Sequence, residues 1–221
     1  MFGAVNEMGG IRFWNAFAKI TGWPLQKLIF RTKILYEDPS VQKRAIRGSA
    51  IIISNHTSVY DYAVFLFVFF GRTLRYQMAE LLFEKKPLGR MLRHMGGIRV
   101  DRNAHDFSFL RISEDILSRG GVVGVFPESR LPREGETPPL PFKPSAAYLA
   151  LASGAPVIPV YTNGRYFQRR RAAVIIGSPM LARELTDDSL SEKENIELVA
   201  QRMREKVIAL RDLLHERYEE K

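Results

Sequence analysis

Apolar residues recur along this chain with two different periods, and the alternation between the two predicts the fold. Short runs rich in β-branched residues predict buried strands at 50–54, 74–78, 98–100, 122–126, 157–161 and 173–176. Helical spacing fills several of the stretches between them, notably 107–119 and 145–153. Strands that alternate with helices favour the α/β class, so we expect a mixed, largely parallel sheet flanked by helices.

The first part of the chain has a helical period and an unusual composition. Apolar residues follow at steps of three and four over 11–18, Gly22-Trp23-Pro24 interrupts the pattern, and a second stretch covers 25–34. Aromatic rings beside basic residues suit a helix in a lipid interface, and a helical pair packed on the protein's own core is the alternative. We expect amphipathic membrane-docking helices in residues 1–40 and one domain over 41–221.

The last helix has a well-defined start. Ser191 and Glu194 form the sequence pattern of a capping box. Apolar residues then recur at steps of three or four up to Leu214. This stripe indicates a helix that packs against the domain.

Charge is unevenly distributed and predicts an anionic partner. Residues 184–221 carry 7 Lys/Arg against 11 Asp/Glu, a net charge of −4. The whole chain has a net charge of +9, so residues 1–183 carry +13. A basic body attracts nucleic acid, anionic lipid or a phosphorylated substrate. Zinc-finger spacing, an RNA-recognition motif and a groove-reading basic helix are all missing from the sequence, so we expect no nucleic-acid partner.

Composition excludes several kinds of chemistry. The chain has no cysteine, which rules out disulfides, thiolate nucleophiles and Cys-based zinc sites. The four histidines lack metal-ligand spacing, so we expect no metal site. Neither a bilayer-spanning apolar run nor a secretory leader is evident, and we expect a peripheral or monotopic protein on the cytoplasmic face of a membrane.

A histidine and a carboxylate follow the strand at 50–54. Reactive groups gather at the carboxyl ends of strands in open α/β sheets, and His56 with Asp61 stands at such an end. Asp61 can hold one ring nitrogen protonated and leave the other free to accept a proton as a general base. Five residues turn about 140° on an ideal helix, so the pair requires an irregular turn between its members.

Five sequence blocks carry a family resemblance. Asn55 to Asp61 matches the H-x4-D box of the glycerolipid acyltransferases, and four further blocks follow in the family's order. These are Gly97 to Arg102, Phe126 to Arg130, Phe142 to Ala147 and Ala155 to Val160. Together the blocks span roughly residues 45–180, and their common order makes the resemblance specific.

The resemblance implies an activity and a mechanism. An acyl chain on coenzyme A or acyl carrier protein would pass to the free hydroxyl of lysophosphatidic acid, giving phosphatidic acid. His56 would act as the general base with Asp61, and Asn55 would support the site or stabilise the oxyanion. A thioester is already activated, so neither a covalent enzyme intermediate nor a cofactor is expected.

The resemblance also implies a phosphate site. Arg130 matches the family arginine that is thought to hold the acceptor's phosphate, and a guanidinium suits that role because its donors form a planar fork. Glu128 would order that arginine or its loop. Arg99 and Arg102 are further candidates for phosphate contact, and Asp101 between them would pair with one.

Two departures from the family pattern leave alternatives open. Ser129 alone stands between Glu128 and Arg130, where the family usually has Gly and Thr. Met78 stands where many members have a lysine implicated in phosphate binding, which leaves open another lysolipid acceptor, such as a lysophosphodiester or an amino-acid lipid. A membrane-binding protein with a vestigial His-Asp pair is the alternative from another class.

Two further segments have two interpretations each. The run from Tyr62 to Phe70 predicts either a slot for the acyl chain or a buried core helix. Arg165 with the arginines at 169–171 predicts a docking site for acyl carrier protein or anionic lipid, and a solvated turn is the alternative.

Overall fold

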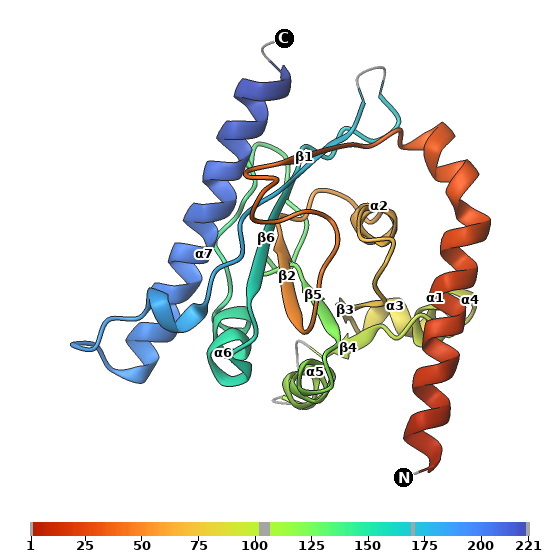
Figure 1. Ribbon diagram of the computed structural model, residues 1–221, viewed down its shortest axis with the longest axis horizontal. Helices are drawn as coiled ribbons and strands as arrows, with labels where there is room; N and C mark the ends of the chain where they lie inside the picture. Colours follow the sequence, from red (N-terminus) through yellow and green to blue (C-terminus); the bar gives the residue numbers. More distant parts are fainter. Residues whose placement is uncertain (1, 102–106, 169–170, 220–221) are drawn as a thin grey trace.

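The computed structural model describes residues 2–101, 107–168 and 171–219, and a seven-stranded sheet forms its centre (Figure 1). The strand order is β1-β7-β6-β2-β5-β3-β4, and every neighbouring pair is parallel except β6 with β7. The strands are β1 (Lys33–Tyr36), β2 (Ala50–Ser54), β3 (Leu74–Ala79), β4 (Ile98–Val100), β5 (Val122–Val125), β6 (Val157–Thr162) and β7 (Ala173–Ile176). The predicted mixed, largely parallel sheet is confirmed.

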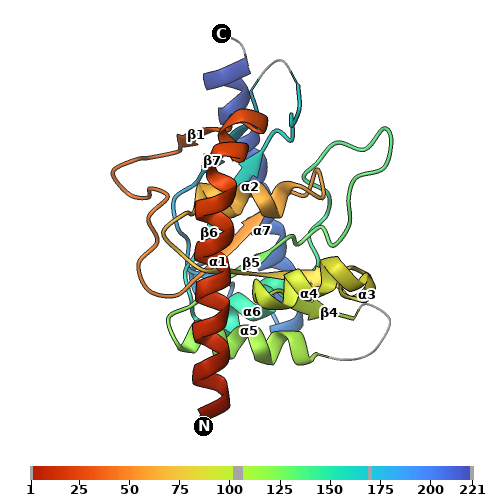
Figure 2. The same ribbon diagram turned by 90° about the vertical axis from the view of Figure 1, so that its right-hand side faces the viewer.

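Helices cover both faces of this sheet (Figures 1 and 2). One face carries α5 (Ser108–Ser118), α6 (Pro144–Ser153) and α7 (Glu192–Leu214), and the other carries α2 (Asp61–Val68), α3 (Leu81–Glu84) and α4 (Lys86–His94). A 3-10 turn, Ala182–Leu185, precedes α7, and a π-helical turn, His215–Glu219, follows it. The capping box at Ser191 is present.

β2 lies in the middle of the sheet, and its composition suits a fully buried strand. Four of its residues are apolar, and the hydroxyl of the fifth, Ser54, donates to the Asn55 carbonyl. All five residues are buried, and Ile51 and Ile53 enter one core while Ile52 enters the other. A strand that is buried on both faces has a continuous run of apolar residues in its sequence, and Ala50 to Ile53 form that run here. Its neighbours β6 and β5 run parallel to it, so the residues after all three strands meet at one edge.

The N-terminal segment is one helix, α1 (Phe2–Ile29), which continues through Pro24. The predicted break at Gly22-Trp23-Pro24 is therefore wrong. Tertiary contacts on both sides of the proline hold the helix: a Cβ built on Gly22 would lie 3.0 Å from the Phe67 ring, and the Phe30 ring meets Tyr166 edge-on with centroids 5.6 Å apart.

The chain leaves α1 through Arg31, which has a φ of +47°, and then joins the sheet as β1. The predicted helical stretch over 25–34 is thus wrong beyond Ile29. Ile34 and Leu35 instead pair in parallel with Val174 and Ile175 of β7. Helical spacing could not reveal this pairing, because the partner strand lies far along the chain.

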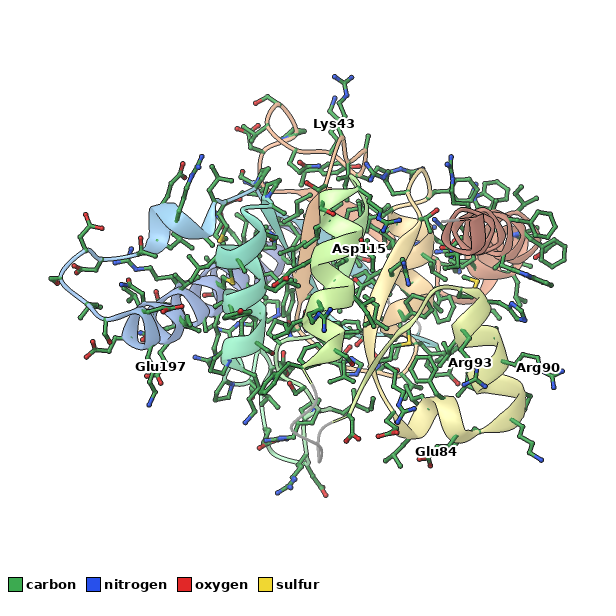
Figure 3. The ribbon with its side chains drawn as sticks, turned by 90° about the horizontal axis from the view of Figure 1, so that it is seen from below. Lys43, Glu84, Arg90, Arg93, Asp115 and Glu197 are labelled. Atoms are coloured by element: carbon green, nitrogen blue, oxygen red, sulfur yellow. The ribbon has the colours of Figure 1, made fainter. Side chains whose placement is uncertain are left out.

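α1 buries two polar residues and exposes several large apolar ones. Asn15 and Lys19 are buried, whereas Phe13 and Leu28 are 63% and 77% exposed. The Asn15 amide donates to the Met95 carbonyl at the end of α4, and the Lys19 ammonium donates to carbonyls that follow α2, including that of Phe70 at 3.1 Å. Seen along its axis in Figure 3, α1 carries ring side chains on its outer side. Within the described residues, no helix is both long enough and apolar enough to cross a bilayer.

Candidate active site

The predicted histidine and carboxylate meet at the carboxyl end of β2. His56 lies in an irregular turn after the strand, and Asp61 is the first residue of α2. The Nδ1 atom of His56 lies 2.8 Å from Oδ2 of Asp61. This geometry supplies the irregular turn that the five-residue spacing requires.

Asp61 is fully buried, and five hydrogen bonds hold its carboxylate. Oδ2 accepts from His56 Nδ1, from the backbone N–H of Thr57 at 2.7 Å and from that of Ser58 at 2.9 Å. Oδ1 accepts from the hydroxyls of Thr57 at 3.0 Å and Tyr166 at 2.7 Å. Because Asp61 stands in the first turn of α2, the helix dipole also favours its negative charge. The carboxylate has little freedom to move away from the ring.

Tyr166 is a site residue that the sequence did not indicate. Its ring is buried, and its hydroxyl lies 2.7 Å from Asp61 and 3.1 Å from the Thr162 hydroxyl. Burial is the largest cause that raises the pKa of Tyr166 above its ordinary value, so the phenol is a donor. The loop reaches the dyad because Gly164 has a φ of +63° and a Cβ there would lie 2.4 Å from Oγ1 of Thr57. The sequence signalled only that this loop follows a predicted strand, and the structure places that strand, β6, beside β2.

The His56 ring is fixed in orientation and open on one side. It stacks on Phe126 with centroids 4.2 Å apart and an interplanar angle of 14°. Its side chain is 21% exposed, and its Nε2 atom has no hydrogen-bond partner among the described residues. With Nδ1 donating to Asp61, Nε2 is left with its lone pair available to a substrate proton.

Glu128 and Asn55 brace the backbone around His56. Oε1 of the buried Glu128 accepts the His56 backbone N–H at 3.2 Å, and burial raises the pKa of Glu128 to about 7. The Asn55 amide donates to the Thr162 carbonyl and accepts from the Thr162 N–H, both at 2.9 Å. Asn55 thereby ties the end of β2 to the end of β6, and its side-chain donor is already engaged, which favours the supporting role over the oxyanion role.

Arg130 follows Glu128, and its guanidinium already holds a carboxylate. NH1 and NH2 bind the two oxygens of Glu136 at 2.6 and 2.7 Å. Glu136 also accepts the Arg133 N–H at 2.7 Å, which closes the loop after β5. Ser129 has a φ of +60°, the backbone conformation that glycine adopts most easily, at the position where the resemblance expects Gly.

Of the other two phosphate candidates, Arg99 lies away from the dyad. Arg99 is an exposed residue of β4 that forms an ion pair with Glu80. β4 stands three strand positions from β2, roughly 14 Å away at the usual strand spacing. Arg102 lies outside the described residues, as do positions 169 and 170 of the predicted basic cluster. Within the described residues, no group of three or more His, Asp or Glu side chains is arranged to hold a metal ion.

Sequence comparison gives the family of this chain. The profile of the family described as Acyltransferase matches residues 33–163, more than half of the chain. The chain belongs to the acyltransferase family. Among curated proteins, the 1-acyl-sn-glycerol-3-phosphate acyltransferase of Bacillus subtilis (strain 168) is 24% identical over 146 residues, which cover 64% of this chain and 70% of that protein.

A solved structure shares the fold of this acyltransferase. The 1-acyl-sn-glycerophosphate (LPA) acyltransferase PlsC from Thermotoga maritima aligns with a TM-score of 0.60 and 22% identity, over 91% of this chain and 79% of that one. The likeness extends beyond the family match at both ends and shows the same α/β fold.

Met78 and the run after Asp61 are both part of the acyltransferase core. Met78 lies in β3 with its side chain 9% exposed, in the same core as Phe83 and Leu92. A lysine at this position would bury its stem and its charge in an apolar layer. In α2, Val64, Phe65 and Leu66 are likewise buried in that core, which agrees with the core-helix interpretation of the run.

Proposed function

We propose that this acyltransferase transfers an acyl chain from a thioester on coenzyme A or acyl carrier protein to the free hydroxyl of lysophosphatidic acid, giving phosphatidic acid. The observation that carries the proposal is the His56–Asp61 hydrogen bond of 2.8 Å at the carboxyl end of β2, in a chain of the acyltransferase family. The acceptor is proposed from the names of the Bacillus subtilis and Thermotoga maritima proteins.

The chemistry needs a base, an acceptor and an activated donor. Asp61 accepts from Nδ1, so Nε2 of His56 takes the hydroxyl proton while the hydroxyl oxygen attacks the thioester carbonyl. As the tetrahedral intermediate collapses, the C–S bond breaks and His56 returns its proton to the leaving thiolate. Tyr166 and the Thr57 backbone hold Asp61 throughout, which keeps the histidine tautomer fixed.

Acceptor recognition is assigned to Arg130. Arg130 follows Glu128, whose carboxylate holds the His56 backbone, so its loop lies beside the base. Its fork of donors matches a phosphate, and the Glu136 carboxylate occupies that fork in the free protein. The acceptor's phosphate therefore exchanges with Glu136 when it binds.

The outer face of α1 is assigned to membrane contact. Phe13, Trp14 and Phe17 form a contiguous exposed cluster in which ring centroids lie 5.8 to 6.3 Å apart. Exposed apolar patches of this kind mark surfaces that bind another apolar phase. We assign the protein to the membrane surface as a peripheral enzyme, with residues 1–40 as the docking unit and 41–221 as the acyltransferase domain.

A substrate panel tests the proposed reaction. Purified protein would be incubated with an acyl-CoA or an acyl carrier protein thioester and with separate lysolipids, and products would be identified by mass spectrometry. We expect phosphatidic acid from lysophosphatidic acid at the highest kcat/KM. Faster acylation of a lysophosphodiester or an amino-acid lipid would contradict the acceptor assignment, and hydrolysis without transfer would contradict the reaction.

A further inference from the structure

A small basic cavity lies where the end of α1 meets β1 and the last turn of α2. Its volume is about 310 Å³, at the lower end of the range for small-ligand pockets. Lys27, Arg31, Arg44 and Arg171 line it, and they come from three separate segments of the chain, because Lys27 lies in the last turn of α1 and Arg31 just after it. The fold has therefore gathered charges that the sequence keeps apart.

These four cations have no acidic partner in the part of the chain that the structure describes. None of the described residues that line the cavity is acidic. Some basic side chains elsewhere do have an acidic partner, as Lys206 has in Glu37 and Arg119 has in Asp115. Like charges that converge on one small cavity repel each other, and a bound anion would offset that repulsion.

The cavity also offers groups suited to a phosphate. Arginine forks bind two phosphate oxygens at once, and a lysine adds a point charge. The Lys27 ammonium is held over the Trp23 ring, 4.1 Å from its centroid, at the rim. Thr32 also lines the cavity, and its buried hydroxyl has no hydrogen-bond partner among the described residues.

The walls indicate where that phosphate comes from. Trp23 and Phe70 line the cavity and are 46% and 36% exposed, and Leu28 on the adjacent turn of α1 is 77% exposed. A phosphate bound here would sit level with apolar side chains that are exposed to their surroundings. A phospholipid headgroup brings a phosphate and an apolar phase together in that arrangement, whereas a soluble phosphate ester does not.

The cavity is separate from the catalytic dyad. Phe67, Val68 and Phe70 line it from the carboxyl end of α2, whereas Asp61 begins that helix. Eight helical residues span roughly 12 Å. A ligand in the cavity can therefore be present while the acceptor occupies the site at His56.

We propose that this cavity binds the headgroup phosphate of an anionic phospholipid, so that one lipid fixes the end of α1 at the membrane surface. This inference rests on the membrane contact of α1 in the proposed function, and it adds a specific lipid site to a general attraction for anionic surfaces. The bound lipid is neither acceptor nor product of the turnover in progress, because it lies at the opposite end of α2 from the base.

Vesicle binding can distinguish a specific lipid site in the cavity from a general attraction between the basic surface and anionic lipid. Arg31→Gln with Arg44→Gln removes two charges from the cavity, and Lys43→Gln with Arg47→Gln removes two exposed charges that do not line it. Lys43 projects away from the protein body in Figure 3. Affinity for phosphatidylcholine vesicles with and without phosphatidylglycerol is measured for each protein. We expect the cavity variant to lose the phosphatidylglycerol-dependent affinity by roughly 30-fold, and the control variant by roughly threefold.

Two outcomes would overturn the inference. Equal losses in the two variants would mean that the surface charge acts diffusely and the cavity is not a site. Binding of inorganic phosphate without vesicles, as tight as binding to anionic vesicles, would assign the cavity to a soluble phosphate ester. Neither outcome bears on acyl transfer, because turnover of a short, soluble lysolipid by the unmodified protein tests the proposed reaction separately.

Discussion

The turn at residues 55–61 and α1 both bury polar side chains, but the turn gathers donors around one carboxylate, whereas α1 leaves a cluster of aromatic rings on its outer face. In the turn, the fully buried Asp61 accepts five hydrogen bonds from its surroundings. On α1, polar Asn15 and Lys19 are buried, and Phe13 and Leu28 are exposed. A buried charge whose donors are all supplied is held rigidly, whereas a cluster of exposed rings marks a surface suited to another apolar phase.

The two regions also meet through one helix. Asp61 begins α2, and the Lys19 ammonium of α1 holds the carbonyl of Phe70 just beyond the end of α2. Burial lowers the pKa of Lys19 to about 8, so it stays mostly protonated at neutral pH and matches the negative end of the helix dipole. The dyad and the exposed rings are nevertheless at different places, although α1 and α2 are in contact. We therefore expect that mutations can change acyl transfer and membrane binding independently.

The largest expected effect is on acyl transfer, from the loss of His56. His56→Ala should lower the rate of acyl transfer by roughly 100- to 10,000-fold, because the acceptor hydroxyl loses its general base, and vesicle binding should not change. Asp61→Asn should be nearly as damaging since the histidine tautomer is no longer fixed. The measurements are steady-state turnover and vesicle co-sedimentation. More than about a tenth of the unmodified rate in His56→Ala would exclude the proposed role.

Acceptor binding should be the next largest effect. Arg130→Ala should lower kcat/KM for lysophosphatidic acid by about 10- to 150-fold, mainly through the acceptor KM, and leave the donor KM unchanged. Arg130→Lys should recover only part of the loss, because it keeps the charge without the fork.

Glu136→Gln is the matched variant for this loop. It frees the Arg130 fork from its internal carboxylate, so the acceptor KM should fall, by about two- to fivefold on the scale of an exposed ion pair. A rise in acceptor KM in Glu136→Gln would show instead that Glu136 positions Arg130 for the substrate.

Mutations on the outer face of α1 should weaken membrane binding and leave acyl transfer unchanged, the reverse of the mutations at His56. Trp14→Ser with Phe17→Ser should weaken vesicle binding by roughly 10-fold, because two apolar rings no longer enter the lipid interface. Turnover of a short, soluble lysolipid should be unchanged. Tyr148→Ser with Leu190→Ser, two exposed apolar residues on the far side of the sheet, provides the control. Equal binding by all three proteins would mean that α1 is not the membrane face.

The smallest predicted effect concerns pH. Burial raises the pKa of Glu128 to about 7, so the protonated form is the one that folding favours. Its stabilisation is complete below the ordinary glutamate pKa of 4.5 and is lost as the pH rises through about 7. Relative to Glu128→Gln, the free energy of unfolding should fall by about 1 to 3 kcal/mol over this range, measured by urea unfolding at several pH values. Parallel pH profiles for the two proteins would contradict the raised pKa.

The local patterns of the sequence were sufficient for much of the fold. The continuous run Ile51-Ile52-Ile53 predicted a strand buried on both faces, and Ser191 with Glu194 predicted the start of α7. His56 and Asp61 were predicted as a pair because they are close in sequence and follow that strand. Such features depend on neighbours within a few residues, so the sequence contains the information they require.

Other features depended on partners far along the chain. Tyr166 reaches Asp61 from 105 residues away, and β1 forms only because β7 supplies its pairing. α1 continues through Pro24 because Phe67 and Tyr166 hold it on either side, against the local preference for a break.

The sequence by itself determined the six strands from β2 to β7, the pairing of His56 with Asp61 and the basic, cysteine-free composition. Tertiary structure decided which face of α1 is exposed, which donors surround Asp61, and that Lys27, Arg31, Arg44 and Arg171 line one cavity. The physical reason is the range of the interactions. Periodicity and capping act within a few turns, whereas burial and the meeting of charges depend on where distant segments pack.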